Sequence, residues 1–152
     1  MISQQHAELI PSAHALLTGR LQSDLANLSA LIFHHYPDLN WAGFYIVDKE
    51  ALFVGPFQGK PACVEIRFGK GVVGSCYQQQ KIINAPDVDA FPGHIACDSA
   101  SRSELVLPIF SQGKVVAVLD LDSPQLHRFD QKIERELTLL RDEVLNHLNW
   151  PS

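Results

Sequence analysis

The chain has 152 residues, which is enough for one domain with its own hydrophobic core, so we expect a single domain over residues 1–152. Its net charge is −5 and no basic stripe runs along it, which argues against nucleic acid as a partner. No apolar run approaches the roughly 18 residues of a membrane span, and the first residues lack the basic and apolar regions of a secretory signal. We therefore expect a cytoplasmic protein with no membrane partner.

The first half of the chain is predicted to form a long helix and three strands. Leucine and isoleucine recur at spacings of three and four, which indicates an amphipathic helix, and Pro11 is expected to separate a short first turn from it. Aromatic and β-branched runs predict the strands. In chain order these elements cover residues 5–35, 40–47, 51–55 and 62–68, with a loop over 56–61. Alternation in the third strand places Val64 and Ile66 on one face and Cys63 and Glu65 on the other.

The second half begins with a glycine-rich turn over residues 69–74 that leads into a short helix. The free N–H groups of that helix would suit a carboxylate, although the glycines are equally explained as turn formers. Three further strands and a last helix follow, over residues 81–85, 104–110, 115–122 and 131–148. This order predicts the α/β (α+β) class, with an antiparallel sheet of six strands flanked by N- and C-terminal helices.

Three cysteines, an odd number, do not fit a framework of structural disulfides, and their spacing matches no zinc-finger pattern. One of them, Cys97, lies in a polar loop beside Asp98, with His94 three residues earlier. A cysteine in such surroundings can form a thiolate and act as a nucleophile. The alternative is an inert thiol in an ordinary connecting loop.

Two aspartates share one face at the end of the sixth strand. Asp120 and Asp122 alternate with leucines, and Glu104 opens the fifth strand. Like charges that are partly buried raise at least one pKa, so the three carboxyls would bind a cation or keep one proton as an acid. We favour an organic ammonium group and predict no metal, because no histidine at ligand spacing joins the cluster. The alternative is a local turn or cap.

Trp41 stands at the head of the first strand. It would supply an aromatic wall for a methyl group or a cation in a pocket. A plain core position explains it equally well.

Five segments together resemble the free methionine-(R)-sulfoxide reductases, which are single GAF domains, and the resemblance runs from about Asn40 to Asp130. The segments are Asn-Trp-Ala-Gly-Phe-Tyr (40–45), Gly-Pro-Phe-Gln-Gly-Lys-Pro-Ala-Cys (55–63), Gly-His-Ile-Ala-Cys-Asp (93–98), Ser-Glu-Leu-Val-Leu-Pro (103–108) and Leu-Asp-Leu-Asp-Ser-Pro (119–124). The resemblance implies a six-stranded antiparallel sheet, usually in a homodimer. It also implies free methionine sulfoxide as substrate and no cofactor, with thioredoxin or a similar dithiol as the external reductant.

The resemblance assigns roles to the two predicted redox cysteines. Cys97 resembles the catalytic nucleophile of the family and Cys63 its resolving cysteine. Many members carry a third redox cysteine where this chain has Val73. We therefore expect turnover with Cys97 and Cys63 alone, and a non-catalytic Cys76.

The resemblance also assigns the pocket. Glu104, Asp120 and Asp122 match its acidic residues, and we expect Asp122 and Glu104 to take part in catalysis as well as in substrate binding. Trp41 matches the aromatic residue that contacts the methyl group of the substrate.

The expected reaction reduces free L-methionine (R)-sulfoxide to L-methionine through a cysteine sulfenic acid and an intramolecular disulfide. The preference for the R form rests on the resemblance alone. The main alternative is a non-catalytic GAF domain that senses a small ligand such as a cyclic nucleotide, but clustered carboxylates would repel a phosphate. A structural dimerisation module is a further alternative, and it leaves the acidic residues unexplained.

Overall fold

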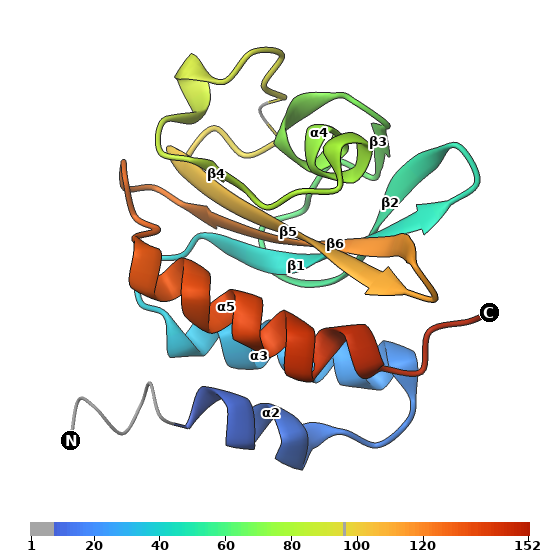
Figure 1. Cartoon of the computed structure of the whole chain (residues 1–152). Helices are drawn as coiled ribbons and strands as arrows, with labels where there is room; N and C mark the ends of the chain where they lie inside the picture. The colour runs from blue at the N-terminus through green and yellow to red at the C-terminus, as the bar shows by residue number, and fades with distance from the viewer. Residues whose placement is uncertain (1–7, 96) are drawn as a thin grey trace.

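A computed structural model of the chain describes residues 8–95 and 97–152. Two helices cover one face of a central sheet, a third packs on the outer side of these two, and a fourth lies on the other face of the sheet (Figure 1). The covering helices are α3 (Leu21–His35) and α5 (Gln131–Glu143), the outer helix is α2 (Leu9–Leu16), and the fourth is α4 (Gly71–Gln79). Two short 3₁₀ helices are η1 (Val88–Ala90) and η2 (Leu145–His147). Within the described part of the chain, no helix combines the length and the apolar character that crossing a membrane requires.

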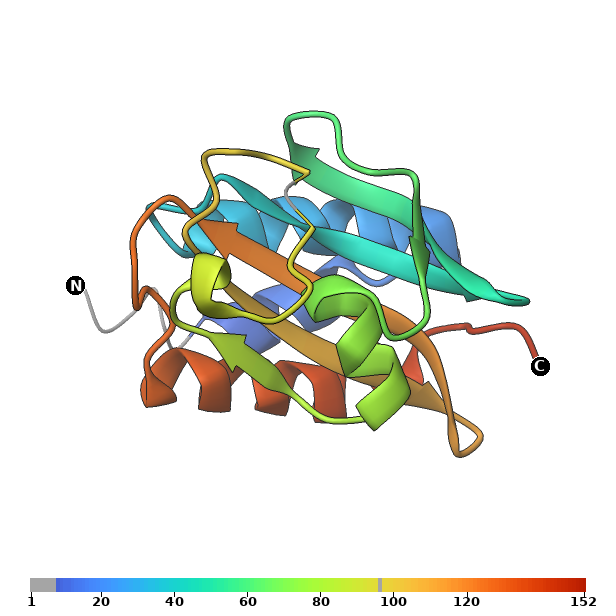
Figure 2. The same cartoon turned by 90° about the horizontal axis from the view of Figure 1, so that it is seen from above.

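The sheet has six strands in the order β3-β2-β1-β6-β5-β4, and every neighbouring pair is antiparallel. The strands are β1 (Trp41–Asp48), β2 (Ala51–Gly59), β3 (Glu65–Arg67), β4 (Ile83–Ala85), β5 (Ser103–Ser111) and β6 (Lys114–Ser123). The prediction of a six-stranded antiparallel sheet flanked by terminal helices is confirmed. Figure 2, which is seen from above, shows α4 and η1 in front of the sheet.

Alternation along β5 and β6 divides the buried side chains between two cores. Leu107 and Leu119 pack on the side of α3 and α5, whereas Val106 and Val118 pack on the side of α4. Each fully buried leucine contributes roughly 1.5–3 kcal/mol through its removal from water. Because side chains alternate, Asp120 follows Val118 onto the α4 side. The face that the sequence predicts for Asp120 is confirmed. Val116 instead packs on the α3 and α5 side, because the register of β5 and β6 shifts beside it.

The predicted helix over residues 5–35 is in fact two helices, and residues 5–7 lie outside the described residues. The chain breaks between α2 and α3, where Gly19 has a φ of +87°. Asp24 stabilises this break, because its carboxylate accepts hydrogen bonds from the Thr18 and Gly19 N–H groups at 2.9 and 3.1 Å. Pro11 causes no break, since it lies in the first turn of α2, where no intrahelical donor is lost. The last helix also ends earlier than predicted, at Glu143.

The boundaries of the second and third strands were predicted wrongly. β2 continues to Gly59 through the expected loop, and β3 covers only residues 65–67. Pro56 is tolerated in β2 because it lies at a bulge, and β3 pairs only with residues 51–53 of β2. Cys63 therefore precedes the strand. Val64, which lies just before β3, is 65% exposed, whereas Ile66 within it is 5% exposed.

Candidate active site

A pocket opens on the α4 side of the sheet, between the sheet, the first turn of α4 and the loop over residues 91–101. Predicted site residues from three strands and this loop line it together. They are Trp41 from β1, Cys97 from the loop, Glu104 from β5, and Asp120 and Asp122 from β6. Cys63 is joined to the pocket through its bond to Cys97. β1 and β5 begin beside the pocket and β6 ends there, so their paired residues converge on it.

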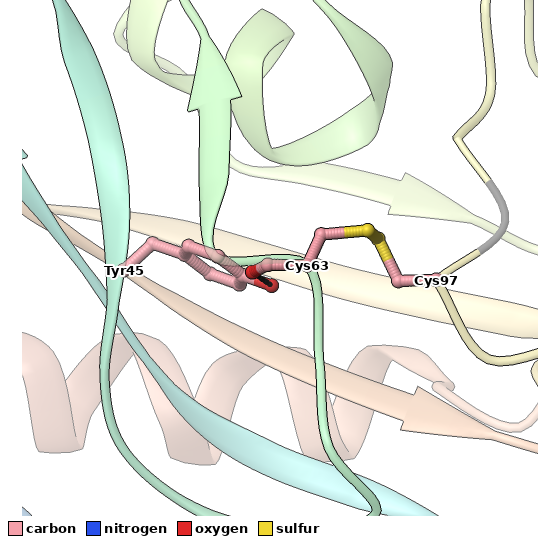
Figure 3. The surroundings of a disulfide bond; sticks show 3 residues. All are labelled: Tyr45, Cys63 and Cys97. Atoms are coloured by element: carbon pink, nitrogen blue, oxygen red, sulfur yellow. Dashed lines mark hydrogen bonds between the residues drawn. A yellow bond between two sulfur atoms is a disulfide. The ribbon is translucent and has the colours of Figure 1, made fainter.

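A disulfide links Cys63 and Cys97, whose Cα atoms are 5.5 Å apart (Figure 3). The bond joins the segment before β3 to the loop over residues 91–101, and both cysteines are half-buried. The pairing implied by the family resemblance is therefore present in the structure. Cys76 is free and fully buried in α4, and burial raises the pKa of its thiol. A thiol that stays neutral is a poor nucleophile, which fits the prediction that Cys76 is not catalytic.

The three carboxyl groups meet because of the pairing of β1, β6 and β5. Asp122 lies directly opposite Glu104 on one side and opposite Trp41 on the other, and Asp120 lies opposite Gly43. One oxygen from each carboxyl lies within 4.8 Å of the others. Glu104 is 7% exposed and Asp120 is 4% exposed, so little water screens their charges.

Burial is the main cause of the raised pKa values of all three carboxyls. Repulsion adds to it: Asp120 raises the pKa of Glu104, Asp122 raises that of Asp120, and Glu104 raises that of Asp122. Glu104 also shares side-chain hydrogen bonds with both aspartates. Oδ1 of Asp120 is buried and has no hydrogen-bond partner among the described residues. The cluster therefore holds protons to a higher pH than separate carboxyls would, and it can donate them or bind a cation.

The pKa of a fourth carboxyl, that of Asp98, is lowered, whereas the pKa values of the cluster are raised. Hydrogen bonds from the Ala100 N–H at 2.9 Å and from Asn40 Nδ2 at 3.0 Å lower the pKa of Asp98, so it stays ionised. Asn40 Nδ2 also donates to Ser101 Oγ at 2.9 Å. The negative charge of Asp98 contributes to the raised pKa of Asp122. Asn40 thus ties the loop over residues 91–101 to the start of β1.

Trp41 is part of the core and also lines the pocket, and its contact with a methyl group of the substrate stays a prediction. It is 3% exposed, and its ring stacks on those of Phe57 at 5.0 Å and Tyr45 at 5.7 Å between centroids. Its Nε1 atom is buried without a partner among the described residues. The stacked rings present a flat apolar surface beside the carboxyl groups.

The first turn of α4 forms another part of the wall. Gly71, Val72 and Val73 line the pocket, and no side chain caps the helix. Gly71 has a φ of +62°, and a Cβ there would come within 3.3 Å of Ile95 in the facing loop. Glycine therefore allows the loop to approach the helix closely, and the first turn, whose N–H groups no side chain caps, lies beside the pocket.

Asn40, Tyr45 and Asp98 contribute contacts that no sequence pattern predicts. Each acts through a hydrogen bond to a residue that is distant in sequence, and no local pattern reveals such a bond. Asn40 and Tyr45 are the first and last residues of the segment 40–45, which carries part of the resemblance, and Asp98 directly follows Cys97. That proximity was the only available signal.

Comparison with known proteins agrees with this geometry. Residues 22–146 match the GAF domain family. Free methionine-R-sulfoxide reductase of Escherichia coli (strain K12) is 43% identical over 137 residues, which are 89% of this chain and 83% of that protein. The protein of the same name from Saccharomyces cerevisiae is 43% identical over 149 residues, covering 91% and 82% of the two chains.

A solved structure extends the comparison to three dimensions. The X-ray structure of free methionine-R-sulfoxide reductase from Neisseria meningitidis, in complex with its substrate, superimposes with a TM-score of 0.87 at 38% identity. It covers 90% of this chain, which in turn covers 84% of it. This chain belongs to the GAF-domain family and, within it, to the free methionine-R-sulfoxide reductases.

Proposed function

We propose that this protein reduces free L-methionine (R)-sulfoxide to L-methionine, with Cys97 as nucleophile and Cys63 as resolving cysteine. The observation that carries the proposal is the Cys63–Cys97 disulfide beside a pocket lined by three proton-holding carboxyls. A thiol pair supplies the two electrons of the reduction, and the carboxyls supply the proton that the sulfoxide oxygen needs. The family membership supports the same reaction.

The first step transfers oxygen from substrate to enzyme. The thiolate of Cys97 attacks the sulfoxide sulfur and forms an S–S bond, while the sulfoxide oxygen takes a proton from a neutral carboxyl of the cluster. The oxygen then moves from the substrate sulfur to the Cys97 sulfur, the S–S bond breaks, and methionine leaves. Cys97 is oxidised to a sulfenic acid and the sulfoxide is reduced to a thioether. Glu104 and Asp122 are the proposed donors, because each pairs with the other across β5 and β6 and has a raised pKa.

Recognition of the free amino acid requires partners for both of its charged groups. The cluster of Glu104, Asp120 and Asp122 would hold the ammonium, since Oδ1 of Asp120 has no partner among the described residues. The N–H groups of the first turn of α4 would hold the carboxylate. Trp41 would contact the methyl group. A residue within a protein lacks both charged groups, and we therefore propose a substrate that is a free amino acid.

The second step closes the bridge. The Cys63 thiolate attacks the sulfur of the sulfenic acid, an S–S bond forms, and the oxygen leaves as water after protonation. Thioredoxin or a similar dithiol then reduces the bridge, and its own two thiols are oxidised to a disulfide. A cytoplasmic location would suit a bridge that must be reduced in each cycle. The homodimer and the absence of a cofactor or metal stay predictions.

A thiol count tests this proposal. One addition of free L-methionine (R)-sulfoxide to the reduced protein, with a metal chelator present, should release one methionine per chain and remove two of the three thiols. Peptide mapping should place the new bridge between Cys63 and Cys97. Loss of no thiols and release of no methionine would contradict the reductase and favour the sensor alternative.

Exposed apolar side chains beside the disulfide suggest how a protein reductant would approach. Val64 is 65% exposed and follows Cys63, and Ile95 is 42% exposed and lies two residues before Cys97. A protein dithiol must bring its thiolate to one of the two sulfur atoms, so it must cover this surface. We propose that Val64 contacts the reductant.

Val64→Glu is expected to lower kcat/KM for thioredoxin about fivefold, because a charge would be buried in the contact. Turnover with dithiothreitol should be unchanged, since a small dithiol needs no such surface. Steady-state assays with each reductant measure the ratio. Leu139→Glu is the matched control, because Leu139 is 49% exposed on α5, on the opposite side of the sheet. Equal losses with both reductants would refute the contact.

A further inference from the structure

A tyrosine from β1 holds the backbone of Cys63. Tyr45 Oη donates a hydrogen bond to the Cys63 carbonyl oxygen at 3.1 Å, and Figure 3 shows the ring reaching from the strand toward that carbonyl. Tyr45 is 2% exposed, and its ring stacks on Trp41. Packing therefore fixes the direction of the hydroxyl, and the hydroxyl in turn constrains the segment that carries Cys63.

That segment is a connection and not a strand, although Ala62 packs against the core on the α4 side. It lies between the end of β2 at Gly59 and the start of β3 at Glu65, outside both strands. From the sheet, the segment is reached by the Tyr45 bond and by a bond from the Val54 N–H to the Val64 carbonyl at 2.9 Å. Segments with few backbone hydrogen bonds open easily, so each of these two bonds limits how far Cys63 can move.

The position of Cys63 matters because disulfide formation has strict geometric limits. The Cα atoms of a bridged pair lie about 4.4–6.8 Å apart, and those of Cys63 and Cys97 lie 5.5 Å apart. Cys97 is held from the other side, since Asp98 accepts a hydrogen bond from Asn40 at the start of β1. The two sulfur-bearing segments are thus both anchored to one strand.

We propose that Tyr45 is a positioning residue for the resolving step: its hydroxyl holds the Cys63 backbone where the thiol can reach the sulfenic acid of Cys97. This inference rests on the proposed function. Tyr45 itself is neither oxidised nor reduced. The bond that forms is Cys63–Cys97 S–S, the bond that breaks is the S–O bond of the sulfenic acid, and water leaves.

The surroundings keep the hydroxyl of Tyr45 able to donate at every working pH. Burial raises the pKa of Tyr45, and the nearby charges of Asp120, Asp122 and Glu104 raise it further. A neutral phenol is a hydrogen-bond donor, whereas a phenolate is not. The hydrogen bond from Tyr45 to Cys63 therefore persists over the pH range in which the thiols react.

A single-turnover experiment on Tyr45→Phe separates positioning from chemistry. Reduced protein is mixed with free L-methionine (R)-sulfoxide, and methionine release and thiol loss are followed by rapid quench. The rate of bridge formation relative to methionine release should fall about fivefold, the effect of one neutral hydrogen bond. The sulfenic acid should accumulate and be trapped by a 1,3-diketone. An unchanged ratio in this variant would overturn the inference.

Tyr36→Phe is the matched control. Tyr36 is 1% exposed in the core on the helix side, and its hydroxyl donates to Glu136 Oε1 at 3.0 Å. This variant also loses a buried tyrosine hydroxyl, but away from the disulfide, so the ratio of the two rates should equal that of the wild type. A fall of the same size in both variants would indicate general loosening of the fold and would also overturn the inference.

An equilibrium measurement is independent of the substrate. In glutathione redox buffers, the fraction of Cys63–Cys97 bridge gives the effective concentration of one thiol toward the other. Tyr45→Phe should lower this concentration about fivefold, and Tyr36→Phe should leave it unchanged. If wild-type protein releases no methionine, the proposed reductase fails while this readout still reports on positioning. An unchanged effective concentration in Tyr45→Phe would refute the positioning role of Tyr45 and would not bear on the proposed reductase.

Discussion

Cys97→Ser is expected to reduce methionine formation by roughly a thousandfold or more, because a serine hydroxyl is a weak nucleophile at neutral pH and cannot accept oxygen as a sulfenic acid does. The pocket itself should remain, since Cys97 contributes a half-buried side chain and no core packing. Methionine release from free L-methionine (R)-sulfoxide, measured with excess dithiothreitol, checks the rate.

Cys76→Ser is the control for this substitution. Cys76 is the free cysteine of the structure and is buried in α4, so its replacement should lower stability, while methionine formation stays within about twofold of the wild type. Full activity in Cys97→Ser would exclude Cys97 as the nucleophile. Loss of activity in Cys76→Ser, with the fold intact, would make Cys76 part of the redox cycle.

Asp120→Asn is expected to make the protein more stable and less active. The substitution keeps the shape of the side chain and removes one of three buried charges that repel one another, which should raise the free energy of unfolding by about 1 kcal/mol at pH 8. The same change removes a carboxylate from the proposed ammonium site. We expect kcat/KM to fall about a hundredfold, as is usual when a buried ion pair loses one partner.

The stability difference should depend on pH in a defined direction. The pKa of Asp120 is raised above its ordinary value of 3.8, so the folded protein binds more protons than the unfolded chain as pH rises above about 4. The contribution of the cluster to stability is therefore fully present at low pH and is lost as pH rises through the folded pKa values. The advantage of Asp120→Asn should be small at pH 4 and larger at pH 8.

Urea denaturation of reduced wild type and variant at both pH values measures this difference. Asp142→Asn is the control, because Asp142 is 53% exposed on α5 and pairs with its neighbour Arg141 at 3.0 Å. Exposed pairs of this kind contribute about 0–1 kcal/mol, and this site is far from the pocket, so activity should not change. A less stable Asp120→Asn at pH 8 would show that the cluster does not carry the proposed repulsion.

The parts of the fold that follow from local alternation were predictable from the sequence. The period of two along β6 placed Asp120 and Asp122 on one face, and the structure brings Glu104 beside them. Aromatic and β-branched runs indicated the strands, and apolar spacings of three and four indicated the amphipathic helices. The acidic half of the site was predictable as well, because it depends on neighbours in sequence and on one adjacent strand.

The parts that were missed depend on contacts between distant residues. The break after α2 is stabilised by Asp24, which lies beyond the break in sequence, and β2 continues through a bulge that lies between its pairings with Gly43 and Tyr45. The pairing of Cys63 with Cys97 came from family resemblance alone, since composition and spacing leave the pairing of three cysteines open.

The Cys63–Cys97 bridge also protects Cys97 from irreversible oxidation. A sulfenic acid that persists can be oxidised by peroxide to a sulfinic acid, which ordinary thiols do not reduce. Closure of the bridge removes the sulfenic acid, and a sulfur within a disulfide no longer offers a thiolate to peroxide. Methionine sulfoxide arises under oxidising conditions, so an enzyme that consumes it works where over-oxidation is most frequent. In the proposed cycle, the oxidised form is therefore both a catalytic intermediate and a protected state of Cys97.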